Sequence, residues 1–431
     1  LNGYGAGTGE PWFLPTGHRI NALECTDPSK PSFFEDLTMM AMAVVSKPKG
    51  GASGNSEHFY GKAIQVTVSV LMDGKACNEN FSLIDLYFVI NDIQTGGGEF
   101  FDFHINRMKI SIYNSVQGVA YELESKAKMV PAEFGSIMST ISNSLQFLGS
   151  PTVQYMLSGP STISPKAFVN GENVNHLYIR FPEHIAEQSA SAIRCIMTAF
   201  FVEQQRKPVR PLKFLLDESF VLGNFSLIPK ICFLGRGSMT TADIYLQNYG
   251  QLLHNFGENE ADTILSNCPF KLILGVSSNK TGEFVSALLG KATYQYLPKS
   301  KQAEASFKRA QAFQQIINGG DLNASILEIM RQNETRQIPD SVARQLMNSD
   351  EVIRRSADEG LLISAGMKPY RTFQQHYFLD RRVAHKFLPN PYHPPFDKIF
   401  IPTKFGRLKP VNIISEKVPQ EIAHLPQYAS S

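Results

Sequence analysis

The sequence lacks long apolar runs and is poor in cysteine. No run of about 18 apolar residues occurs in the 431-residue chain, so no membrane-spanning helix is expected within it. No signal peptide is expected within these residues either. The five cysteines (25, 77, 195, 232 and 268) form no CxxC pair, which argues against a disulfide framework or a zinc site. This pattern is typical of a reducing cytosol, and Cys195, Cys232 and Cys268 are expected to be core residues.

A strong charge of either sign is missing as well. The net charge is +2, and the 43% hydrophobic and 19% charged residues are ordinary for a globular protein. Two segments, 103–113 and 368–387, mix basic and aromatic residues. They are interpreted either as a nucleic-acid-binding surface or as solvated surface with core aromatics, and the second interpretation is preferred. Three dispersed histidines are expected to be structural residues: His58, His104 and His254.

The hydrophobic pattern changes near residue 149. Residues 28–148 show helical periodicity, with few strand signals. After residue 149, strand patterns alternate with helical ones, which predicts βαβ crossovers and a parallel sheet. The expected strands are 175–182, 212–216, 241–248 and 270–276, followed by a hairpin around residues 366–369. Residues 299–320 predict a charged, solvated helix, and the Pro-rich tail 389–431 predicts irregular structure.

Two adjacent carboxylates end one expected strand. Asp217 and Glu218 follow the apolar stretch 212–216, which is expected to be a buried central strand. In open α/β sheets, ligands bind outside the carboxyl ends of the strands. Two neighbouring buried acids are unfavourable unless a cation or a substrate offsets their charge. The structural alternative is that Asp217 caps the helix that starts at Ser219.

Polar residues follow the neighbouring expected strands as well. Gln247 ends the strand 241–248, and the strand 270–276 runs into Ser277 and Asn279. A GRG turn containing Arg236 precedes the strand 241–248. This arrangement predicts a RecA-like NTP hydrolase, in which Asp217 holds Mg²⁺, Glu218 polarises the attacking water and Gln247 senses the γ-phosphate of ATP.

The motifs in residues 213–290 resemble those of the TraG/TraD-like type IV secretion coupling proteins. They are LLDE followed by LG, the GRG turn, a Gln followed by QL, YG with A-x-T-I-x-x-N, and a final LLG. EHFYGKA (57–63) and RQLMNSDEVIRR (344–355) resemble flanking family motifs, and the resemblance extends over most of residues 20–385.

The resemblance implies a RecA-like P-loop NTPase fold, with a parallel sheet flanked by helices and an inserted all-α domain. The expected domains are part of the nucleotide-binding domain (1–27), the all-α domain (28–148), the RecA-like nucleotide-binding domain (149–388) and the Pro-rich tail (389–431).

By motif match, Asp217 and Glu218 form the Walker B pair and Gln247 is the sensor. Ser277 and Asn279, in the turn after the strand 270–276, are expected to contact nucleotide. Arg236 matches the family's GR turn. It is expected either to act as an arginine finger that reaches a neighbouring subunit or to be a surface residue of the turn.

The implied protein is a homo-hexameric ATPase at the cytoplasmic face of the bacterial inner membrane. It uses ATP and Mg²⁺, and it delivers relaxase–DNA complexes or protein effectors with their adaptors to the channel components. Contact with the membrane is expected through residues outside this chain. The alternatives are an FtsK/HerA-like DNA translocase and a non-hydrolysing platform for effectors or adaptors.

The sequence departs from the family by lacking the P-loop G-x-x-x-x-G-K-[ST]. The three GK pairs, in 59–64, 72–77 and 288–293, are each followed by Ala and have no upstream Gly at the required spacing. The chain starts at Leu1, and in the family the P-loop lies upstream of the region that matches residue 1. We therefore expect a portion of a longer protein, with a degenerate paralogue as the alternative.

Overall fold

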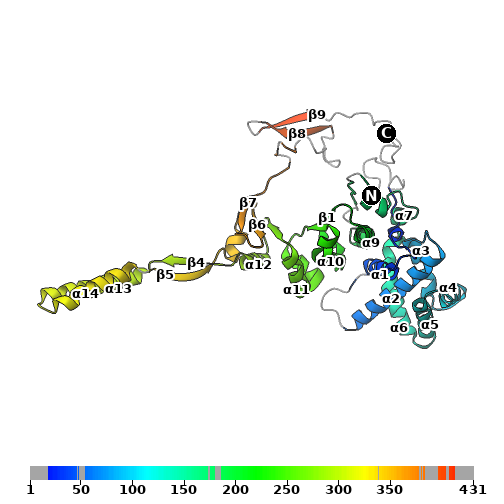
Figure 1. The fold of residues 1–431 in the computed structure, drawn as a ribbon, viewed down its shortest axis with the longest axis horizontal. Helices are drawn as coiled ribbons and strands as arrows, with labels where there is room; N and C mark the ends of the chain where they lie inside the picture. Colours follow the sequence, from blue (N-terminus) through cyan, green and yellow to red (C-terminus); the bar gives the residue numbers. More distant parts are fainter. Residues whose placement is uncertain are drawn as a thin grey trace. The chain divides into compact units, whose positions relative to one another are not determined.

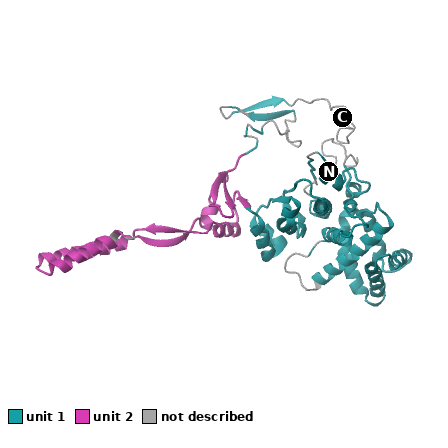
Figure 2. Cartoon of the chain, viewed as in Figure 1, with its two compact units in different colours: residues 1–269, 376–431 teal, residues 270–375 magenta. Residues whose placement is uncertain are grey.

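The computed structural model describes residues 18–45, 47, 54–172, 175–179, 186–337, 339–377, 380, 382–383, 397–403 and 407–412. The chain forms two compact units (Figure 1, Figure 2). Unit 1 comprises residues 1–269 and 376–431, and unit 2 comprises residues 270–375. Among the described residues, no helix has both the length and the apolar character needed to cross a bilayer.

Unit 1 begins with a block of helices, and its described residues from 18 to 172 contain no strand. The helices are η1 (Ala22–Cys25), α1 (Phe33–Val44), α2 (Gly54–Cys77), α3 (Leu83–Gln94), α4 (Glu99–Lys109), α5 (Asn114–Met129), α6 (Pro131–Leu145), η2 (Gln146–Gly149), α7 (Pro151–Leu157) and α8 (Pro165–Asn170). The prediction of mostly helical structure over residues 28–148 is therefore confirmed for the described residues of that range, which exclude 46 and 48–53.

Local sequence signals explain several helix ends in this block. Ser82 and Asp85 form a capping box at α3, because each side chain accepts a hydrogen bond from the other's backbone N–H. Pro131 occupies the first turn of α6, where a missing N–H has no consequence for the helix.

The rest of unit 1 contains one parallel and one antiparallel pair of strands. Its elements are α9 (Ala186–Arg206), β1 (Leu212–Leu216), η4 (Ser219–Leu222), α10 (Leu227–Leu234), η5 (Gly235–Ser238), β2 (Thr240–Ile244), α11 (Tyr249–Asn267), β8 (Lys398–Pro402) and β9 (Leu408–Asn412). β1 and β2 pair in parallel, and β8 and β9 pair antiparallel. The tail was expected to be irregular, so β8 and β9 correct that prediction over their residues.

Helix α9 is the central element of unit 1. Fifteen of its residues between Ser189 and Gln204 are buried, which is typical of a helix covered on all sides. One continuous core contains Leu37 of α1, Leu86 of α3, Ile196 of α9 and Leu216 of β1. Because this core runs through both the helical block and the β1–β2 region, the boundary expected at residue 148 stays a prediction.

Unit 2 contains three strands in an antiparallel sheet and a two-stranded ribbon. Its elements are β3 (Phe270–Ile273), α12 (Asn279–Leu289), β4 (Lys291–Tyr296), α13 (Lys299–Ile317), α14 (Leu322–Gln337), β5 (Asp340–Gln345), α15 (Ser349–Ile353), β6 (Glu359–Ser364) and β7 (Tyr370–Phe373). The strand order is β3-β6-β7 in the sheet, and β4 pairs with β5 in the ribbon. A small core contains Val285, Leu289, Val352 and Leu361.

Two strand predictions need correction. Residues 270–273 do form a strand, but it pairs antiparallel with β6 and does not extend the β1–β2 pair. Residues 175–179, expected to begin a strand, have no regular secondary structure, and residues 180–182 lie outside the described residues. The predicted hairpin around residues 366–369 is confirmed, since β6 and β7 pair with Leu362 opposite Tyr370. The helix predicted in residues 299–320 is α13.

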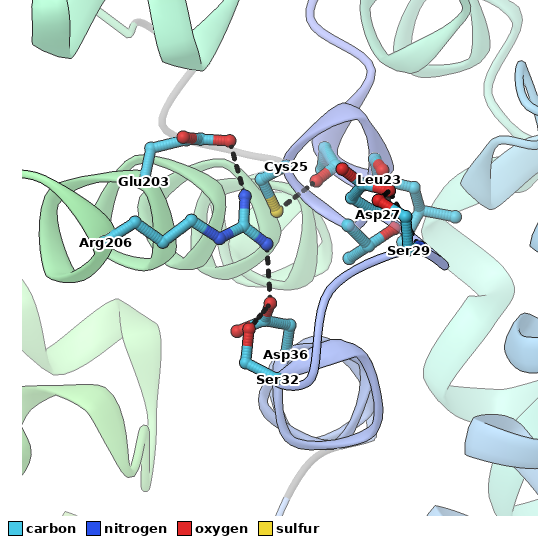
Figure 3. Close-up of polar contacts among 10 residues, drawn as sticks. Leu23, Cys25, Asp27, Ser29, Ser32, Asp36, Glu203 and Arg206 are labelled. Atoms are coloured by element: carbon cyan, nitrogen blue, oxygen red, sulfur yellow. Dashed lines mark hydrogen bonds and ion pairs between the residues drawn. The ribbon is translucent and has the colours of Figure 1, made fainter.

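A polar network joins α1 to α9 (Figure 3). Arg206 Nη2 lies 2.5 Å from Asp36 Oδ2, and Arg206 Nη1 lies 2.8 Å from Glu203 Oε1. Burial raises the pKa of Glu203, since it disfavours the charged carboxylate. Burial also opposes the charged form of Arg206, but the hydrogen bond with Asp36 and the charges of both acids raise the pKa of Arg206 overall. Nearby, the Cys25 thiol donates to Ala22 O, and burial raises its pKa.

Arg206→Met is expected to lower the free energy of unfolding by about 3 kcal/mol, because Asp36 and Glu203 then remain buried without their cation. Urea unfolding measures the effect, and Lys207→Met, which removes an exposed charge beside it, is the control. Equal midpoints for the two variants would show that the network adds no stability.

Candidate functional site at the carboxyl ends of β1 and β2

The parallel pairing of β1 and β2 brings two predicted site segments to one edge. Leu216 lies opposite Ile244 at the end of the pair, and Tyr245 N donates to Leu216 O at 3.1 Å. Asp217 and Glu218 follow Leu216, and Gln247 follows β2 by three residues. The acidic pair and Gln247 therefore leave neighbouring strands at the same edge.

The turn after β1 is tied directly to the end of β2. Ser219 donates both its backbone N–H and its hydroxyl to Tyr245 O, at 3.3 and 2.9 Å. Glu218 has φ 51° and ψ 45°, the left-handed conformation that glycine tolerates best. Such a conformation is unfavourable by about 1–3 kcal/mol in a non-glycine residue and is enriched at functional sites. Ser219 thus anchors a turn in which Glu218 is strained.

Both carboxylates are exposed to solvent. Within the described part of the chain, neither makes a side-chain hydrogen bond or an ion pair. Asp217 makes no helix cap, because η4 has Glu218 as its N-cap residue and no side-chain capping bond. The acids are therefore available to a ligand, and carboxylate oxygen is a donor that Mg²⁺ prefers. The two carboxylates fit the expected Mg²⁺.

Gln247 is exposed and interacts with the next helix. Its backbone N–H donates to Gln251 Oε1 at 3.0 Å, and Gln251 Nε2 donates to Gln247 Oε1 at 3.3 Å. Gln251 in turn donates its backbone N–H to the N-cap side chain of Asn248. The amide of Gln247 is thus oriented by the start of α11.

Arg236 lies at the opposite end of β2 from the acids. It sits in η5, before the amino end of β2, and is exposed. Gly235 allows this turn to close, because a Cβ there would lie 2.3 Å from Thr240 O. A five-residue strand spans about 17 Å, so Arg236 is distant from Glu218 of its own subunit.

Ser277 and Asn279 belong to unit 2. Both are exposed, and Asn279 is the first residue of α12, after the carboxyl end of β3. Their proposed role in binding nucleotide therefore stays a prediction.

Strand β1 is less buried than its sequence predicts. Leu215 is 65% exposed, and the strand alternates between half-buried and exposed positions before the buried Leu216. Among the described strands, β1 pairs only with β2, so it is not the central strand that was expected. Only one face of β1 packs against the core that contains Leu216, so burial explains the apolar residues of that face alone.

Sequence reasoning missed Arg194. This residue of α9 is 5% exposed, and burial lowers its pKa. Its guanidinium donates to Ala43 O at 2.8 Å and to Leu222 O at 3.1 Å, which ties η4 to the end of α1. The detectable signal was a single arginine inside the apolar stretch 190–202.

The basic residues of segment 103–113 are paired with acids. Arg107 Nε lies 2.7 Å from Asp73 Oδ2, and Lys109 Nζ lies 2.6 Å from Glu124 Oε2. These pairs favour the preferred interpretation of a solvated surface. Part of segment 368–387 lies outside the described residues.

The geometry defines a mixed α/β protein with acidic residues at the carboxyl edge of a parallel strand pair. Solved structures with a similar fold agree with this class. The bacterial conjugative coupling protein TrwBΔN70 in its unbound form aligns with a TM-score of 0.57 at 14% identity, covering 87% of this chain and 72% of that one. TrwB in complex with ADP and Mg²⁺ aligns with a TM-score of 0.51 at 13% identity, covering 79% and 68%. The predicted RecA-like α/β class is confirmed.

Residues 211–355 match the family model described as the TraM recognition site of TraD and TraG. The type IV secretion system-coupling protein VirD4 of Bartonella quintana is 21% identical over 58% of this chain. VirD4 of Bartonella henselae is 24% identical over 48% of this chain. The chain is thus similar to the TraG/TraD-like coupling proteins of type IV secretion systems, which confirms the resemblance. It spans about a third of those two proteins, 36% and 33% of their lengths.

Proposed function

We propose that these residues form the Walker B side of the ATPase site in a type IV secretion coupling protein. The observation that carries this proposal is the meeting of Asp217, Glu218 and Gln247 at one carboxyl edge, within the residues that match the family model. The neighbouring structures support it, since TrwB was solved in complex with ADP and Mg²⁺ and with a non-hydrolysable ATP analogue.

In this proposal each residue has a distinct task. Asp217 holds Mg²⁺, which supplies charge neutralisation on the phosphates when it is bound. Glu218 accepts a hydrogen bond from the attacking water and takes its proton. Gln247 hydrogen-bonds the water or the γ-phosphate. Ser277 and Asn279 are proposed as further nucleotide contacts. A phosphate-binding loop from outside the 431 residues completes the site.

The same proposal includes the assembly and its cargo. The active form is a homo-hexamer at the cytoplasmic face of the bacterial inner membrane, attached through residues outside this chain. It engages type IV secretion channel components, and its substrates are relaxase–DNA complexes or protein effectors presented by adaptors. The names of the VirD4 relatives and the TraM recognition description of residues 211–355 support these partners.

Asp217→Asn is expected to lower Mg²⁺-dependent phosphate release from ATP by at least about 100-fold, because an amide is a poor ligand for Mg²⁺. The assay uses the longest reading frame that contains these residues. Asp243→Asn is the matched control, since Asp243 lies in β2 and pairs with Lys213.

Unchanged hydrolysis in Asp217→Asn would refute the assignment of Asp217. If the unmodified protein binds no nucleotide at all, the platform interpretation replaces the motor. Neither result bears on the FtsK/HerA alternative, against which the type IV secretion relatives argue.

A further inference from the structure

Helices α13 and α14 of unit 2 pack against each other as a hairpin that is joined by residues 318–321 (Figure 1). The residues buried between the two helices are small or polar. They are Ala305 and Ala312 on α13, and Ser325 and Gln332 on α14. Each pair is seven residues apart, which is the spacing of a helix–helix seam. This seam leaves most of the large apolar side chains of both helices outside it.

Seven large apolar side chains of the hairpin are 41–81% exposed. They are Phe307, Phe313 and Ile317 on α13, and Leu322, Ile326, Leu327 and Met330 on α14. At about 200 Å² for a fully exposed side chain of this size, their exposed parts amount to roughly 850 Å². Soluble monomers rarely expose contiguous apolar patches larger than a few hundred Å². An apolar surface of this size is typical of an interaction site.

The apolar side chains form one row on each helix, at helical spacing. The rows are Ala310, Phe313 and Ile317 on α13, and Leu322, Ile326 and Met330 on α14. Arg309 lies one turn before Phe313, at the edge of the first row. Asn333 lies one turn after Met330, at the end of the second row. Because Arg309 Nη1 donates to Asn333 Oδ1 at 2.9 Å, the two rows border the same edge of the seam. They therefore form one apolar face of the hairpin.

The other face of the hairpin carries charges of both signs. Glu304, Lys308 and Gln311 follow one another at i, i+4 and i+7 on α13, and Lys308 Nζ lies 2.8 Å from Glu304 Oε1. Glu328 and Arg331 are one turn apart on α14. Helices that lie on a membrane surface have a polar face rich in Lys and Arg. The mixed charges argue against a lipid surface and favour a protein partner.

The size and the charge of the hairpin indicate which protein that is. Its exposed apolar area is close to the value of about 800 Å² that each partner buries in a stable complex. Two copies packed face to face would bury both apolar faces in a four-helix bundle. Helix α13 carries four basic residues and one acidic residue, whereas α14 carries two of each. Contact of α13 with α14 of the other copy avoids bringing two cationic helices together and makes all neighbouring helices antiparallel.

We propose that the α13–α14 hairpin is a dimerisation element, which packs its apolar face against the same face of a second copy of this chain. Helix α13 of each copy lies against α14 of the other, and both 318–321 turns lie at the same end of the bundle. This isologous contact is distinct from the head-to-tail contacts of a ring. It does not depend on the proposed ATPase site, because none of its residues belongs to that site.

The test measures self-association of the 431-residue chain by sedimentation equilibrium, without nucleotide. A concentration-dependent dimer is expected, with a Kd on the order of 1 µM. Met330→Glu places a charge where the dimer would desolvate it, and it is expected to weaken association by at least about 100-fold. Gln311→Glu adds the same charge to the other face of the hairpin and is the matched control, with a Kd within about 2-fold of that of the unmodified chain.

A second variant controls for loss of the hairpin itself. Met330 is 62% exposed, and Glu forms helices about as well as Met and Gln. Met330→Glu is therefore expected to leave the far-ultraviolet circular dichroism unchanged. If the helix content nevertheless falls, Ile317→Glu tests the same face at a position that is 81% exposed, and it is expected to weaken association about 10-fold.

Photo-cross-linking locates the contact. With p-benzoylphenylalanine in place of Phe313, irradiation of a mixture of ¹⁵N-labelled and unlabelled chains is expected to give a covalent dimer. Mass spectrometry of the peptides that join a labelled to an unlabelled chain is expected to find the attachment within α14 of the other copy.

Three outcomes would overturn the proposal. They are a chain that stays monomeric up to about 100 µM, equal Kd values for Met330→Glu and Gln311→Glu, and attachment of the cross-linker outside α14. If a monomeric chain instead sediments with phosphatidylglycerol vesicles and Met330→Glu abolishes this, the apolar face binds a lipid surface and not a second copy.

Discussion

Glu218→Gln is expected to retain nucleotide binding and to lower ATP hydrolysis by about 10²–10⁴-fold, the usual contribution of a general base. The substitution preserves the size of the side chain and its hydrogen-bonding reach but removes the proton acceptor. Since Glu218 has no side-chain partner among the described residues, its loss is expected to leave the melting temperature nearly unchanged. Steady-state hydrolysis, equilibrium binding of ATP and thermal unfolding are measured on the longest reading frame.

The matched control is Glu258→Gln, which changes an exposed carboxylate on α11. Hydrolysis within about 3-fold of the unmodified protein in Glu218→Gln would assign the water to another residue. A large fall in melting temperature would instead show that Glu218 supports the fold. The loss of hydrolysis would then be attributed to unfolding and not to a missing proton acceptor. Glu218→Asp separates these cases, because it keeps the proton acceptor in a shorter side chain.

Arg236→Ala is expected to lower ATP hydrolysis by about 10³–10⁵-fold, the contribution of an arginine finger in phosphoryl transfer. The geometric reason is its position before the amino end of β2, about 17 Å of strand away from Glu218. An arginine at that end cannot serve the acids of its own subunit, but a ring with head-to-tail contacts can bring it to a neighbour. Arg210→Ala, which removes a half-buried arginine ahead of β1, is the control.

Mixed assemblies test whether Arg236 acts across an interface. Rings containing Arg236→Ala and Glu218→Gln subunits are expected to regain part of the activity that each variant lacks alone. The recovery comes from interfaces where an intact Glu218 of one subunit meets an intact Arg236 of the next. No recovery in assemblies shown to contain both variants would contradict action in trans. Full activity of Arg236→Ala alone would leave Arg236 as a surface turn residue.

The parallel pair β1–β2 and its polar ends were predictable from the sequence. Each strand shows a short apolar pattern bounded by turn residues, and the helical segment between them implies a crossover. The same rule failed for β3, because an apolar run does not say in which direction its neighbour runs. Its partner β6 begins 86 residues after Ile273, and such distant pairing leaves no local signal.

The surroundings of the candidate site were harder to predict. The left-handed backbone of Glu218 depends on the anchoring of Ser219 to Tyr245, which is a tertiary contact. The role of Arg194 depends on carbonyl groups of two distant segments, at Ala43 and Leu222. The ribbon β4–β5 was missed for the same reason, since Lys291 pairs with Gln345 across the whole of α13 and α14.

The division of the chain at residues 269 and 270 has a consequence for dissecting this protein. The family match, residues 211–355, begins after α9 and crosses from unit 1 into unit 2. A recombinant piece cut at those limits would separate Leu216 and Ile228 from the helix against which their core is built. Boundaries taken from sequence families are therefore poor guides for subcloning here, and a cut that keeps α9 together with β1 is the sounder choice.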